Sequence, residues 1–153
     1  MVKLFAQHEK VIRVLNSHHV RFLVIGGYAV NFHGFVRPTG DIDLWLEPTE
    51  ENKILFLQAI QSLGISEQAR KKVELKDFRS FTAFHLGQEP YRVDFLTLIN
   101  GVLFSDAVKD KIEITLGDVC IPFISRKHLI VSKISNDRTQ DKLDVEKLQQ
   151  ITK

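Results

Sequence analysis

Two aspartates separated by one residue are the first feature of the sequence that could do chemistry. Asp41 and Asp43 lie in segment 41–46, where polar and apolar side chains alternate until Pro48. Side chains alternate across a β-strand, so a strand here would place both carboxylates on one face. Such a pair could bind a hard divalent cation. A solvated strand edge is the alternative explanation of the pattern.

A third carboxylate stands in a later segment. Asp94 lies between Val93 and Phe95, in a run over 91–98 that we expect to pair as a hairpin with 80–86. Three acidic groups on one sheet face repel each other unless a metal ion lies among them. The sequence therefore predicts one divalent-metal site formed by these three aspartates.

Two glycines precede the first aspartate. Residues 22–25 form an apolar run typical of a buried strand, and Gly26 and Gly27 follow it. We expect a helix from about 28 to 35. Glycines at a strand–helix junction let the backbone approach a ligand closely, and a helix N-terminus attracts phosphate. A tight turn without any ligand explains the junction when it is considered alone.

The combination of these motifs resembles a known signature. A Gly-Gly pair, thirteen residues, Asp-Ile-Asp and a later apolar-Asp-apolar strand resemble the polymerase-β-type nucleotidyltransferase superfamily. Within it, the chain looks like a minimal bacterial member of the AbiEii-type toxin group. The residues that carry this likeness are Gly26, Gly27, Tyr28, Ala29, His33, Gly34, Arg37, Thr39, segment 41–44, and a second motif with Lys133, Arg138, Asp141 and Asp144.

The resemblance implies a fold and a domain organisation. The fold class would be α+β, with a palm-like central mixed sheet flanked by helices. We expect residues 1–153 to form a single domain, with a core over about 20–125. Helices over about 126–152 would complete it.

The resemblance also implies a reaction. Nucleoside monophosphate would pass from a nucleoside triphosphate to a hydroxyl acceptor, with release of pyrophosphate. Two Mg²⁺ ions, or Mn²⁺, would be held by Asp41, Asp43 and Asp94, and Asp94 would help deprotonate the acceptor. The nucleotide-binding residues would be Gly26, Gly27, Arg37, Thr39 and Lys133.

Two of these cations have alternative explanations. Arg37 could instead form an ion pair with Asp41 or Asp43. Lys133 could lie on a solvated helix face, or pair with Asp141 or Asp144 where the last helix docks. His33 is expected to pack or to cap rather than to react.

Segment 70–79 bears on the acceptor. It carries five positive and two negative charges, and it either contacts RNA phosphates or is merely solvated. We interpret the overlapping basic segment 69–76 as mobile. The acceptor could be an RNA 3′ end, a protein or a small molecule such as an antibiotic. A cognate antitoxin protein is a possible partner. The alternative class is a catalytically inactive relative that binds a nucleotide or a partner.

Composition sets the limits of these hypotheses. The 153 residues include 21 Lys and Arg against 19 Asp and Glu, so the net charge of +2 gives no global basic field. A single cysteine, Cys120, and the lack of an apolar leader or of a membrane-length apolar run favour a cytoplasmic protein.

Overall fold

A computed structural model describes residues 3–151 of the chain. Within them, six strands form one mixed sheet in the order β3-β4-β2-β1-β6-β5. The strands are β1 (Phe22–Ile25), β2 (Ile42–Leu46), β3 (Ala83–Leu86), β4 (Val93–Leu96), β5 (Ile112–Leu116) and β6 (Val119–Phe123). The helices are α1 (Ala6–Ser17), α2 (Gly26–Phe32), α3 (Glu50–Ser62), α4 (Glu67–Glu74), α5 (Phe104–Ala107), the short 3₁₀ turn η1 (Val108–Asp110), α6 (Arg126–Ile134) and α7 (Thr139–Gln149).

The pairing of the central strands places residues that are far apart in sequence side by side. β2 runs antiparallel to β1 and parallel to β4. β1 also pairs in parallel with β6, where Val24 lies opposite Phe123. The two outer pairs, β3 with β4 and β5 with β6, are antiparallel hairpins. The predicted α+β class with a central mixed sheet is thereby confirmed.

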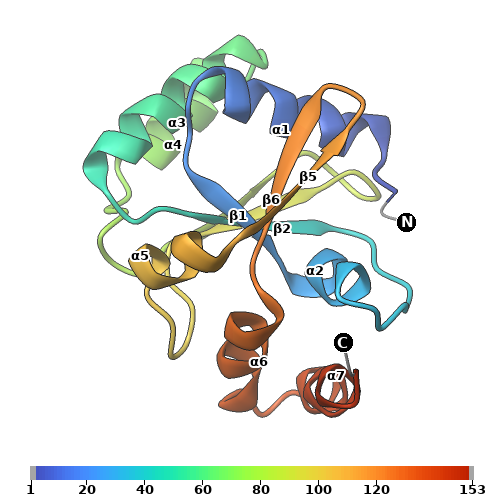
Figure 1. Ribbon diagram of the computed structural model, residues 1–153. Coiled ribbons are helices and arrows are strands. Elements are labelled where there is room, and N and C mark those ends of the chain that lie inside the picture. The colour runs from blue at the N-terminus through green and yellow to red at the C-terminus, as the bar shows by residue number, and fades with distance from the viewer. Residues whose placement is uncertain (1–2, 152–153) are drawn as a thin grey trace.

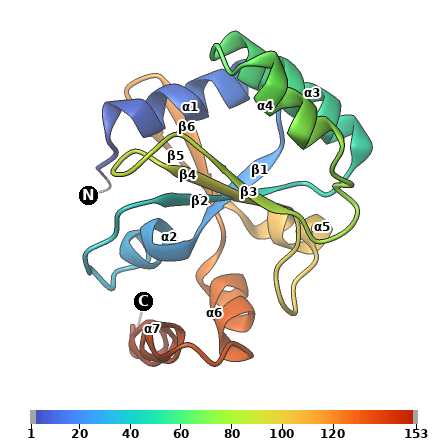
Figure 2. The ribbon, with the colours of Figure 1, turned by 180° about the vertical axis from the view of Figure 1, so that it is seen from behind.

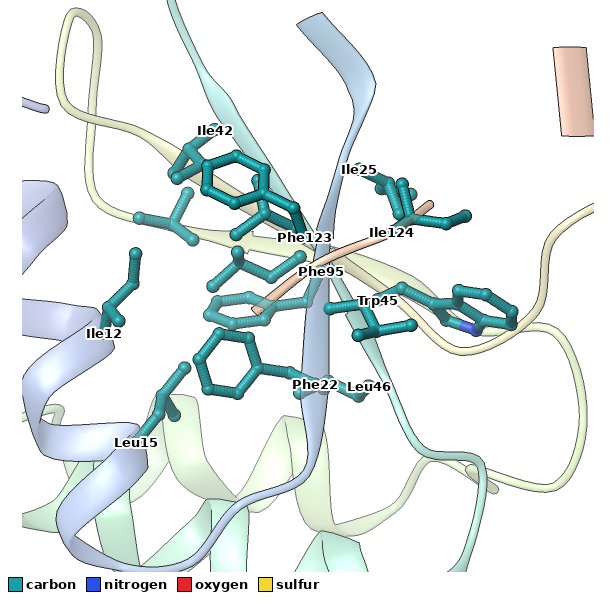
Figure 3. Packing of buried hydrophobic residues seen from close by; sticks show 14 of the residues in the cluster. Ile12, Leu15, Phe22, Ile25, Ile42, Trp45, Leu46, Phe95, Phe123 and Ile124 are labelled. Atoms are coloured by element: carbon teal, nitrogen blue, oxygen red, sulfur yellow. The ribbon is translucent and has the colours of Figure 1, made fainter. Parts of the chain in front are cut away.

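Helices cover both faces of the sheet. Figures 1 and 2 show α1, α3 and α4 on one face, and α2, α5, α6 and α7 on the other. Successive side chains of β2 point to opposite faces of the sheet. Ile42 and Leu44 share one face and are fully buried, while Trp45 on the other face packs edge-on against Phe104 of α5. In Figure 3, Ile12 and Leu15 of α1 lie on the opposite side of the strands from Ile25, Trp45 and Ile124.

The predicted elements are largely present, with shifted ends. α2 begins at Gly26 and ends at Phe32, whereas the pattern predicted a helix over 28–35. Thr49 and Ser125 cap their helices, because each hydroxyl accepts a backbone N–H in the first turn. No helix within residues 3–151 is long and apolar enough to cross a membrane.

The interpretation of segment 69–76 as mobile is wrong. It lies largely in α4, which Ser66 caps by accepting the amide of Ala69. Val73 is buried in the core and anchors the helix, while Leu75 just beyond it is exposed. Most residues of this short helix are charged, so the sequence pattern did not indicate that one apolar residue, Val73, packs it against the core.

Candidate active site

Asp43 and Asp94 are neighbours across two parallel strands. The register of β2 and β4 pairs the two residues directly, so both side chains project from the same sheet face. The row continues to β3, where the exposed His85 lies opposite Asp94 in antiparallel register. Asp41 lies one residue before β2, and Val93 of β4 pairs with Ile42 beside it. The predicted face is therefore shared by carboxylates from two strands.

Arg92 is the cation of this face, and the sequence reasoning missed it. Its Nη2 lies 2.8 Å from Oδ2 of Asp41, and its Nε lies 3.1 Å from Oδ1 of Asp94. Arg92 stands two residues before Asp94, so the strand period puts the two side chains on one face. The Arg-x-Asp spacing was the available signal.

The carboxyl group of Asp43 has a raised pKa. Burial first, and then the negative charges of Asp94 and Asp41, raise its pKa to about 7. The positive charges of Lys133 and Arg138 act in the opposite direction. The carboxyl group of Asp43 therefore keeps its proton to a higher pH than that of an ordinary aspartate.

Gly26 brings the start of α2 against Asp43. Its φ is +69°, a conformation that side chains rarely adopt, and a Cβ on it would lie 2.1 Å from Oδ2 of Asp43. A Cβ on Gly27 would lie 2.3 Å from Oγ1 of Thr39. Glycine is therefore required at these two positions by packing, because the backbone lies directly against the side chains of Asp43 and Thr39. The ligand-binding role of the pair remains a prediction.

We expect Gly26→Ala to destabilise the protein by more than the about 1–2 kcal/mol that left-handed backbone costs an alanine. The additional loss comes from the contact with Asp43, which must move. Urea unfolding measures the difference. Gly117→Ala is the matched control, because Gly117 has a φ of +62° and nothing within 4 Å of an added Cβ. Equal losses in both variants would mean that the contact with Asp43 carries no energy.

Lys133 is buried in an ion-pair network with α7. Its Nζ lies 2.8 Å from Oδ1 of Asp141 and 3.0 Å from Oδ2 of Asp144. Both acids are buried, and Asp144 has no exposed surface. The solvated-face alternative for Lys133 is therefore wrong, and the pairing expected where the last helix docks is present. Arg138 lies at the edge of this network, with Nε 3.9 Å from Oδ2 of Asp141.

Arg37 belongs to the same network. It donates from Nε and Nη2 to the two carboxylate oxygens of Asp144, both at 2.9 Å. The alternative that paired Arg37 with Asp41 or Asp43 is wrong, because the docked α7 supplies a buried carboxylate that those residues do not. Burial by itself would raise the pKa of Asp144, but hydrogen bonds from Arg37, Lys133 and Gln140 outweigh it and hold the pKa below its ordinary value.

A cavity opens beside Asp43 and reaches this network. Its volume is about 570 Å³. Polar groups of its wall include Asp43, Asn100, Lys133, Asn136, Arg138 and Asp141, and apolar ones include Phe81, Leu96, Leu98 and Leu129. Gly26 also lines it. Of the predicted nucleotide-binding residues, Gly26 and Lys133 therefore face one cavity with Asp43, while Arg37 is engaged with Asp144.

The carboxylates fit a hard divalent cation chemically. All their donors are oxygens, and Oδ1 of Asp41 is buried without a hydrogen-bond partner. Asp94 and Asp41 add to the effect of burial on the pKa of Asp43, and a divalent ion would neutralise the charges of these aspartates. As they stand, however, residues 3–151 contain no group of three His, Cys, Asp or Glu side chains arranged to hold a metal. The three-aspartate metal site accordingly stays a prediction.

Other predicted residues have structural partners. His33 contacts the carbonyl oxygen of Ile124 through Nε2 at 2.7 Å, which accords with a packing role. In the basic segment, Arg79 pairs with Asp77, and Lys71 lies 3.9 Å from Glu67. Two of the five cations of segment 70–79 therefore have a carboxylate nearby.

Comparisons with known proteins agree with this fold. Residues 4–153 match the model of a family described as "Nucleotidyl transferase of unknown function (DUF2204)", and the chain belongs to this family. The search of curated proteins gave no match.

Two solved structures show the same fold. One is the lincosamide antibiotic adenylyltransferase LnuA with lincomycin bound, at 16% identity and a TM-score of 0.54, covering 99% of this chain and 100% of that one. The other is an antigenic nucleotidyltransferase-like protein from Paracoccidioides brasiliensis, at 14% identity and a TM-score of 0.55, covering 95% of this chain and 77% of that one. At these identities the likeness concerns the fold.

Proposed function

We propose that this protein is a metal-dependent nucleotidyltransferase that transfers a nucleoside monophosphate from a nucleoside triphosphate to a hydroxyl acceptor. The observation that carries the proposal is the pairing of Asp43 with Asp94 across β2 and β4, next to a cavity that Gly26 and Lys133 also line. Membership in a nucleotidyltransferase family supports the same reaction class. The pyrophosphate of the donor is the other product.

The chain's own residues have distinct parts in this proposal. Gly26 and Gly27 have no side chain that would fill the space beside Asp43 and Thr39, so the donor phosphates can approach the backbone there. Lys133 and the more exposed Arg138 offer positive charge in the cavity wall, where negative charge develops on the leaving group. Asp94 accepts the proton of the attacking hydroxyl. Arg37 acts indirectly, through its ion pair with Asp144.

Asp41, Asp43 and Asp94 would hold the metal, most simply two Mg²⁺ ions, with Mn²⁺ as a substitute. A metal held there would supply positive charge to neutralise the donor phosphates and the charge that develops during transfer. The carboxylates supply the oxygen ligands that these ions prefer.

The test is to follow the label of the transferred group. Purified protein is incubated with Mg²⁺, cell extract and each α-³²P-labelled nucleoside triphosphate in turn. We expect label to enter one class of acceptor, RNA, protein or small molecule, and to do so only when metal is present. Asp94→Asn should lose this labelling, while substitution of the exposed Asp137 by Asn should retain it.

The same experiment separates the alternatives. Labelled RNA would support contact through segment 70–79, and labelled protein or small molecule would direct the search to those acceptors. Binding of nucleotide without transfer of any label would favour a catalytically inactive relative over an enzyme. Co-purification of a second protein with the tagged chain would support the antitoxin partnership of the AbiEii-type group.

A further inference from the structure

One guanidinium group serves three carboxylates at the proposed metal site. Besides its contacts with Asp41 and Asp94, Arg92 places Nη1 3.8 Å from Oε1 of Glu89. Its Nη2 also donates to Oδ2 of Asp94 at 3.3 Å. The side chain of Arg92 is 35% exposed, so solvent reaches part of it.

The register of the sheet fixes this arrangement. Val93 pairs with Ile42, so the residues before them, Arg92 and Asp41, meet at the same end of the two strands. Arg92 and Asp94 share a face because they are two residues apart. The guanidinium consequently bridges Asp41, just before β2, and Asp94 within β4. It lies within ion-pair distance of Oδ2 of Asp41 and Oδ1 of Asp94, and it donates to Oδ2 of Asp94.

These are oxygens that the proposed metal would need. A carboxylate oxygen that ligates Mg²⁺ lies about 2.0–2.1 Å from the ion, and the ion demands a near-octahedral set of oxygens around it. A guanidinium held between the two carboxylates occupies the space where such a set would form. The like charge of the two cations adds to the exclusion.

We propose that Arg92 and the divalent metal compete for Asp41 and Asp94, so that Arg92 sets the metal concentration at which the site assembles. This inference rests on the proposed function. In the metal-free protein, Arg92 neutralises the aspartates and holds them together. On metal binding it leaves them for Glu89, whose side chain is 64% exposed and gives the guanidinium a carboxylate partner outside the pair.

Metal affinity measured without turnover tests this competition. Mn²⁺ is titrated into the full-length protein, with and without ATP, and free Mn²⁺ is read by electron paramagnetic resonance. We expect Arg92→Gln to bind Mn²⁺ about two- to fivefold more tightly than the unsubstituted protein, the range that loss of a competing partly exposed ion pair allows. Arg92→Lys should fall in between, because an ammonium cannot bridge two carboxylates as a guanidinium does.

A matched control separates direct competition from the change in net charge. Arg13 also bridges two carboxylates, Glu9 at 3.2 Å and Asp118 at 2.8 Å, but it lies on α1, and neither partner is one of the proposed metal ligands. Arg13→Gln should leave the Mn²⁺ affinity unchanged. A second readout is melting temperature: Arg92→Gln should lower it in the absence of metal and regain it with Mn²⁺.

The outcomes distinguish this inference from the function on which it rests. If Arg92→Gln binds Mn²⁺ no more tightly than the unsubstituted protein, or more weakly, competition is wrong although the metal site stands. If neither protein binds Mn²⁺, with or without ATP, the proposed function fails as well. An equal gain in Arg13→Gln would reduce the effect to net charge and overturn the role of Arg92.

Discussion

Asp43→Asn is expected to abolish nucleotidyl transfer and to raise the melting temperature of the metal-free protein. The substitution keeps the shape of the side chain but removes one of the charges that Asp94 and Asp41 oppose. We expect the loss of transfer to exceed about a hundredfold, the upper end for residues that only support a metal ligand. Labelled-phosphate transfer measures the first effect and differential scanning calorimetry the second.

The gain in stability should depend on pH. The pKa of Asp43 is about 7 in the folded protein, against 3.8 for an ordinary aspartate. The stability associated with protonated Asp43 is therefore complete below about pH 4 and is lost as the pH rises to 7. Asp43→Asn, which does not titrate, should match the unsubstituted protein at pH 4 and exceed it at pH 8. About 1.36 kcal/mol per pKa unit sets an upper bound of about 4 kcal/mol.

The exposed Asp137 supplies the control for this comparison. Asp137→Asn should give a difference in melting temperature that does not change between pH 4 and pH 8. A gap between Asp43→Asn and the unsubstituted protein that stays constant over this range would contradict the electrostatic explanation. Retained transfer activity in Asp43→Asn would contradict its place in the reaction.

Asp144→Ala is expected to lower the free energy of unfolding by about 3–5 kcal/mol, the range for breaking a buried ion pair from one side. Asp144 is fully buried, and its loss leaves Arg37 without a carboxylate and Lys133 with Asp141 alone. The network links α6, α7 and the segment between α2 and β2, so all three should loosen. Urea unfolding at neutral pH measures the loss.

Asp118→Ala is the matched control for Asp144→Ala. Asp118 also pairs with an arginine, at 2.8 Å from Arg13, but its side chain is 80% exposed. Exposed pairs contribute about 0–1 kcal/mol, so this variant should remain close to the unsubstituted protein. A loss in Asp144→Ala no larger than in Asp118→Ala would show that the network does not hold α7 in place.

Local patterns in the sequence were sufficient for most elements and for the shared face of the aspartates. Alternation around Asp43 and Asp94 predicted strands, and the apolar run over 22–25 predicted another. These signals depend on residues within one strand or one helical turn. The order of the strands does not, which is why the parallel pairing of β2 with β4 became known only from the structure.

The incorrect predictions concern partners that tertiary structure selects. Arg37 and Asp144 are 107 residues apart, and nothing near either residue indicates the other. Asp41 and Asp43 are much closer to Arg37 in the sequence, and this proximity favoured them as its predicted partners. Asp41 instead pairs with Arg92, which precedes the neighbouring strand β4. The sequence thus indicated that Arg37 pairs with a carboxylate, but it did not indicate which one.

The parallel pairing of β1 with β6 has a consequence for the order in which the chain acquires its structure during synthesis. Val24 cannot meet Phe123 until most of the chain has left the ribosome, whereas β2 and β4 are complete once residue 96 has emerged. Asp43 and Asp94 can therefore come together before Lys133 and Arg138 have emerged from the ribosome. Through that interval Arg92, the residue just before β4, is the cation in contact with Asp41 and Asp94.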